Sequence, residues 1–127
     1  MIDVAKLQGW IEELGYDTAL EGPSMLRITP REGEPLPPFF VQCTENWVLL
    51  SILGLLAPDA FRAVGFNRRL LAANRDMRVA KYALDENGEV VLCAELPTES
   101  LDPPELADAV ERMVSLARRF RADFFSE

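Results

Sequence analysis

Residues 79–96 read VAKYALDENGEVVLCAEL and give the clearest structural signal in the chain. Two largely apolar runs, residues 79–84 and 89–96, flank the tetrapeptide Asp-Glu-Asn-Gly. Asn-Gly favours the positive φ angles of a hairpin turn, and bounded apolar runs of this length favour strands. We therefore predict an antiparallel β-hairpin at this point.

The residues after the hairpin predict a long last helix. Asp102 is a suitable N-cap, Pro103 occupies the first helical position, and Glu105 completes a capping box. Apolar residues then recur at alternating steps of four and three and form one seam: Leu106, Val110, Met113, Ala117, Phe120 and Phe124. A continuous seam of this length must pack against another surface.

The N-terminal half predicts one helix followed by strands. Helical spacing runs from Val4 to Leu14, with Asp3 as a plausible N-cap and Gly15 as the stop. After a brief extended stretch at residues 16–21, three strands are expected at residues 25–29, 39–44 and 47–53, the last two joined by a tight turn. Residues 30–38 contain four prolines and form an exposed loop by composition.

Residues 58–75 predict a second helix, with Gly65 weakening its middle by about 1 kcal/mol relative to alanine. Its apolar residues fall on two faces, so a sheet alone would leave apolar surface bare. A second helix or a second subunit could cover that surface, and a wide helix buried within one chain would account for it equally well. For the dimer, the predicted contact residues are Phe61, Phe66, Leu70 and Ala73.

The predicted element order is helix, three strands, helix, two-strand hairpin, helix. Runs of strands rather than strict alternation with helices indicate an α+β fold with a twisted antiparallel sheet and helices packed on it. At 127 residues, the chain fits a single domain spanning 1–127.

The composition restricts the possible partners. The net charge of −8 and a pI near 4.6 repel nucleic acid and anionic membrane at long range. No apolar run is long enough to span a bilayer, and residues 1–15 lack the basic start and apolar core of a signal peptide. We expect a cytoplasmic protein that binds neither membrane nor, directly, nucleic acid.

Residue types that carry catalysis or bind cofactors are scarce. The chain has no histidine, which removes Ser-His-Asp and Cys-His arrangements and the commonest zinc ligand. Its two cysteines lie fifty positions apart, its glycines are scattered singly, and its paired acids are adjacent and therefore diverge. We predict no enzyme activity, no catalytic residues, no metal and no cofactor.

The charge is distributed unevenly along the sequence. Residues 58–82 hold six basic and two acidic residues, a local charge of +4, whereas both ends of the chain are acidic. These arginines are expected to pair with acids of a neighbouring subunit or of the last helix, although a nucleic-acid contact is the alternative. Candidate partner-binding residues are Arg68 and Arg69 in this segment, together with Trp10 and Trp47, because exposed tryptophans are favoured in binding hot spots.

Two stretches of the chain resemble a known family. FNRRLLAAN at residues 66–74, and KYALDENGEVVL at residues 81–92 followed by Glu95-Leu96-Pro97, resemble the YbjN family. That resemblance implies the fold of type III secretion chaperones, a homodimer formed through the second helix, and binding of extended client segments, partly by strand addition at a sheet edge. YbjN relatives are also linked to regulation and stress responses.

The expected function is therefore that of a dimeric chaperone-like or adaptor protein that binds a partner polypeptide. The alternative is a regulator that acts on DNA, or on a DNA-binding protein, through the basic second helix.

Overall fold

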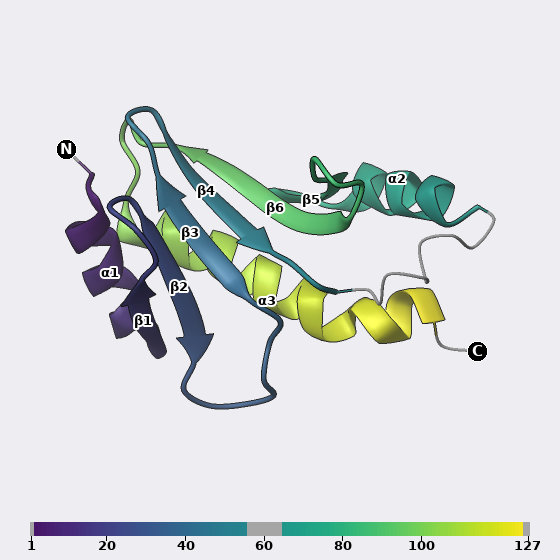
Figure 1. Cartoon of the computed structure of the whole chain (residues 1–127), viewed down its shortest axis with the longest axis horizontal. Coiled ribbons are helices and arrows are strands. Elements are labelled where there is room, and N and C mark those ends of the chain that lie inside the picture. Colours follow the sequence, from purple (N-terminus) through teal and green to yellow (C-terminus); the bar gives the residue numbers. More distant parts are fainter. Residues whose placement is uncertain (1, 56–64, 126–127) are drawn as a thin grey trace.

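The computed structural model describes residues 2–55 and 65–125, and it has an α+β architecture (Figure 1). Six strands form one sheet in the order β1-β2-β3-β4-β6-β5, and every neighbouring pair is antiparallel. The elements are α1 (Val4–Glu13), β1 (Tyr16–Leu20), β2 (Met25–Pro30), β3 (Phe39–Cys43), β4 (Trp47–Ile52), α2 (Phe66–Asp76), β5 (Ala80–Leu84), β6 (Val90–Pro97) and α3 (Pro103–Phe125). The predicted fold class is confirmed.

The core lies between one face of this sheet and the helices: α3 runs behind the sheet, and α1 and α2 add buried residues of their own (Figure 1). Alternate strand residues point into the core, as a half-buried antiparallel sheet requires. The seam of α3 is buried as predicted, except that Ala117 is half-buried. Near the end of α3, the rings of Phe120 and Phe124 pack at 5.6 Å from the ring of Tyr82 on β5.

Both predicted helix caps are present. Asp3 accepts a hydrogen bond from the backbone N–H of Lys6, and Asp102 accepts one from the N–H of Glu105. Each bond satisfies one of the N–H groups that an α-helix leaves without a partner in its first turn. These caps fix α1 and α3 at the residues where the sequence places their starts.

The hairpin at residues 79–96 also forms as predicted, as strands β5 and β6. Gly88 adopts a positive φ of 79°, and the Asp85 carboxylate accepts hydrogen bonds from the N–H groups of Asn87 and Glu89. Side-chain acceptance of this kind stabilises a turn locally.

Two expectations are wrong. The second helix does not continue through Gly65, which has a left-handed φ of 80° and immediately precedes α2; the predicted residues 58–64 lie outside the described part of the chain. Residues 16–20 form a complete strand, β1, where only a brief extension was expected. The pairing of β1 with β2 therefore puts four strands, rather than three, before the second helix.

Candidate functional site

The open sheet has two edges, β1 and β5, and they differ in how their backbone groups are satisfied. On β1, the odd-numbered residues face β2, because the N–H of Glu21 bonds the carbonyl of Met25 and the N–H of Arg31 bonds that of Gly15. In an antiparallel pair, hydrogen-bonded residues alternate with residues whose N–H and C=O groups point away from the neighbouring strand, here β2. The backbone groups of three consecutive even residues therefore face outward: Tyr16, Thr18 and Leu20.

The β1 edge is open to another strand. Within the described part of the chain, no group hydrogen bonds to the outward N–H or C=O of Thr18, and only its hydroxyl is engaged, by the Gln8 amide at 2.8 Å. Leu20 is 62% exposed and Leu14, at the end of α1, is 39% exposed. Unpaired edge groups beside exposed apolar side chains are the features that strand addition uses.

The β5 edge is closed by α2. Its outward residues are the even ones, since the N–H of Asp85 bonds the carbonyl of Glu89, the residue just before β6. At the central residue, Tyr82, the Asn74 side chain accepts from the backbone N–H at 2.8 Å and donates to the carbonyl at 2.9 Å. A single side chain therefore occupies both hydrogen-bonding groups at the middle of this edge.

The sheet face opposite the core carries a mixture of half-buried and exposed side chains. Phe40 and Leu49 are half-buried there, with Arg27 placed 5.9 Å from the Phe40 ring centre. Cys93 lies on the same face, and burial together with the nearby Glu95 carboxylate raises the pKa of its thiol. A raised pKa keeps the thiol protonated and poorly nucleophilic.

The structure places the predicted dimer-contact residues unevenly. Phe66 and Leu70 are buried within the chain, and Phe66 packs at 5.8 Å from the ring of Phe124. Ala73 is half-buried, and Phe61 lies outside the described residues. The large apolar side chain that α2 leaves exposed is Leu71, at 70%.

Most described cations of the basic segment bind backbone carbonyls. Arg69 donates to the carbonyl of Phe124 and lies 5.3 Å from its ring centre. Arg78 and Lys81 donate to carbonyls at the C-terminal end of α2, where cations complement the helix dipole. The expected link to the last helix exists, but it joins a carbonyl rather than an acid, and Arg68 remains exposed.

The four predicted partner-binding residues do not form one site. Trp10 is half-buried on α1, and Trp47 is 44% exposed at the start of β4. Arg68 and Arg69 belong to α2, at the end of the molecule opposite α1 (Figure 1). Their roles in binding remain predictions.

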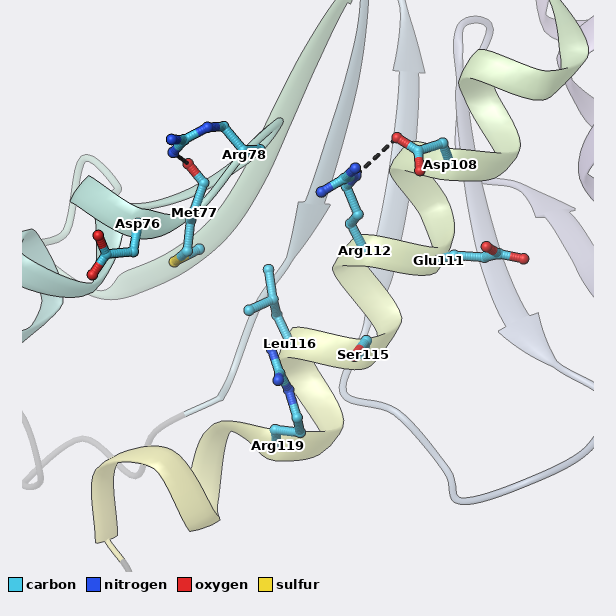
Figure 2. Close-up of a pocket in the computed structure, with 9 residues that line it drawn as sticks. All are labelled: Asp76, Met77, Arg78, Asp108, Glu111, Arg112, Ser115, Leu116 and Arg119. Atoms are coloured by element: carbon cyan, nitrogen blue, oxygen red, sulfur yellow. Dashed lines mark hydrogen bonds and ion pairs between the residues drawn. The ribbon is translucent and has the colours of Figure 1, made fainter.

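A cavity of about 380 Å³ lies between the end of α2 and the middle of α3 (Figure 2). Its charged side chains pair locally: Arg112 binds Asp108 at 2.8 Å, and Arg78 folds back onto the carbonyl of Met77. Figure 2 shows Glu111 directed away from α2, so this acid does not converge on Asp76 across the cavity. The cavity is a surface recess, and the ion pair that lines it, Arg112–Asp108, lies within a single helix.

Metal-binding clusters and membrane-spanning helices are both absent from the described residues. These residues contain no cluster of three or more acidic or cysteine side chains placed to hold a metal ion. Nor does any helix among them combine the length and apolarity needed to cross a membrane.

The sequence matches the family model of the Tir chaperone protein (CesT) family over residues 7–121. The chain belongs to the CesT family. This membership confirms the predicted resemblance to type III secretion chaperones, and the predicted likeness to YbjN is confirmed as a likeness of fold. It also supports the expected chaperone-like role of binding another protein.

Solved structures share the fold of this CesT-family chain. A chain of the heterodimeric ExoU-SpcU complex from the type III secretion system of Pseudomonas aeruginosa is 23% identical, with a TM-score of 0.69 and 98% of each chain covered. YbjN, a candidate transcription regulator from E. coli, is 19% identical, with a TM-score of 0.70, and the match covers 95% of this chain and 92% of that one. No curated protein matches the sequence.

Proposed function

We propose that this CesT-family protein is a non-catalytic chaperone or adaptor that holds an extended segment of another polypeptide at the β1 edge. The observation that carries the proposal is the asymmetry of the two edges: the central residue of β1, Thr18, presents free backbone groups, whereas that of β5 is occupied. A partner chain in a sheet-bound complex gains affinity from main-chain hydrogen bonds, which do not depend on its sequence.

Side chains beside β1 add an apolar contribution. An incoming strand would lie against Leu20, and burying a leucine side chain contributes about 2 kcal/mol. Leu14 at the end of α1 offers a second apolar contact near the same strand. The favoured partner segment is therefore extended and apolar at alternate positions.

A proline at Thr18 tests the edge directly. The N–H of Thr18 points away from β2, so Thr18→Pro removes an outward donor and blocks close approach while leaving the β1–β2 ladder intact. Leu84→Pro is the matched control, because Leu84 is an outward residue at the end of the closed β5 edge. Proteins captured from the native cell by the wild-type chain should be lost from Thr18→Pro and kept by Leu84→Pro.

Equal capture by Thr18→Pro and the wild type, with both variants folded by circular dichroism, would refute binding at β1. If Leu84→Pro alone loses the captured proteins, the binding edge is β5 and the proposed site is wrong.

We further propose that the protein acts as a homodimer through the exposed face of α2, and that its partner binding serves regulation or a stress response. The exposed Leu71 supports the dimer, since an apolar side chain this accessible on an otherwise polar helix face favours association.

The alternative, regulation through direct DNA contact, has less support. Arg69, Arg78 and Lys81 already bind carbonyls of the chain itself. Arg68 and Arg75 remain exposed on α2, and Arg75 lies 3.6 Å from Asp76. Two such cations on a chain of net charge −8 provide little attraction for a phosphate backbone.

A further inference from the structure

One side chain, that of Asn74, occupies the middle of the β5 edge. β5 is a five-residue strand, and its outward residues are Ala80, Tyr82 and Leu84. The N–H of Ala80 already donates to the carbonyl of Arg78, so an added strand would depend on Leu84 and on Tyr82, the central residue. The Asn74 amide makes both bonds there, at 2.8 and 2.9 Å, and therefore takes the place of the peptide group of a neighbouring strand.

Neighbouring bonds hold Asn74 in position. The Lys81 ammonium donates to the backbone carbonyls of Asn74 and Met77, both at 2.6 Å. The N–H of Ala80 donates to the carbonyl of Arg78 at 2.7 Å, which closes the connection from α2 to β5. Because the last turn of α2 is tied to the first residues of β5, the Asn74 side chain remains opposite Tyr82.

We propose that Asn74 is a specificity-determining residue that closes β5 to strand addition and so confines the polypeptide partner to β1. This inference rests on the proposed function. Natural sheets commonly protect their edges against unwanted pairing, often with a charged side chain that disfavours an added strand. Here an amide side chain protects the edge by hydrogen bonding to the backbone N–H and C=O of Tyr82.

A purely structural role for Asn74, fastening α2 to β5, makes a different prediction. If Asn74 only holds α2 against β5, its removal loosens α2 but creates no new strand-binding site. If Asn74 instead blocks strand addition, its removal exposes the Tyr82 backbone and produces a second edge able to accept a strand. The two roles are therefore separated by binding at β5 and not by stability.

The test compares Asn74→Ala with Asn67→Ala, an exposed asparagine of the same helix, in the full chain. The probe is a capped octapeptide of alternating threonine and valine that carries a nitroxide label, and the readout is paramagnetic broadening of backbone amides. The wild type and Asn67→Ala should show broadening at β1 alone. Asn74→Ala should show it at both edges, with exchange of the Tyr82 amide proton accelerated about tenfold, as loss of one hydrogen bond predicts.

Asn74→Asp serves as a second variant should alanine prevent folding. Its carboxylate keeps an acceptor for the Tyr82 N–H but cannot donate to the carbonyl, so it should also admit the probe to β5. The inference is overturned if folded Asn74→Ala leaves exchange at Tyr82 unchanged, or if the probe never approaches β5 in a folded Asn74→Ala or Asn74→Asp. Absence of broadening at β1 in the wild type counts against the proposed function instead, and probe binding to β5 in Asn74→Ala would still support closure by Asn74.

Discussion

Tyr82 joins three parts of the fold through a single residue. Its ring packs edge-on against Phe120 and Phe124 of α3, and its backbone is bound by Asn74 of α2. Burial, with a smaller contribution from the Asp123 carboxylate, raises the pKa of the Tyr82 phenol to about 12, while Arg119 acts in the opposite direction. The folded chain therefore favours the neutral phenol more strongly than the unfolded chain does.

This difference predicts a loss of stability at high pH. Because the folded pKa lies above the ordinary value of 10, the stabilising contribution is fully present below pH 10 and is lost as pH rises from 10 through 12. Urea unfolding at pH 8 and pH 11 measures the effect. Tyr82→Phe keeps the ring and removes the ionisation, so its free energy of unfolding should fall less over this range than that of the wild type; an equal fall would assign the loss to other groups.

At the scale of elements, the connection from α2 to β5 contains backbone strain. Val79 has a φ of 70°, and the bond from the Ala80 N–H to the Arg78 carbonyl spans it as a γ-turn. A γ-turn with positive φ is rare, and a β-branched residue rarely adopts that conformation. The strained residue separates the helix that carries Asn74 from the edge that Asn74 closes.

Relief of this strain should stabilise the protein. Glycine adopts positive φ without a Cβ clash, so Val79→Gly should raise the free energy of unfolding by about 1 kcal/mol, despite the greater flexibility of glycine in the unfolded chain. Ala83→Gly is the control, since Ala83 lies within β5, where glycine should cost about 0.5–1 kcal/mol. Urea denaturation measures both, and equal losses in the two variants would show that Val79 is not strained.

Local signals made some elements predictable from sequence. The hairpin and α3 were correctly predicted because turn residues, caps and apolar spacing act within a few positions. Gly65 was misjudged because its left-handed φ places it just before the start of α2, and β1 was underestimated because its strand character depends on pairing with β2. The sequence contains no comparable signal for Asn74, whose role arises from bonds to a strand eight residues further along.

At the scale of the whole molecule, the two proposed binding surfaces lie at opposite ends. The β1 edge is beside α1, whereas α2 extends from the far end of the sheet (Figure 1). A dimer formed through α2 would therefore leave both β1 edges free for partner chains. This separation makes association and partner binding independently testable.

The last prediction uses two exposed leucines, Leu71 on α2 and Leu20 at the end of β1. In a two-fold dimer each substitution acts twice, and burial of a leucine contributes about 2 kcal/mol, so Leu71→Glu should weaken association by roughly a thousandfold. Light scattering at micromolar concentration should then find monomers that still capture partner proteins. Leu20→Glu should remain dimeric and lose that capture; a Leu71→Glu protein that stays dimeric would place the subunit contact away from the exposed face of α2.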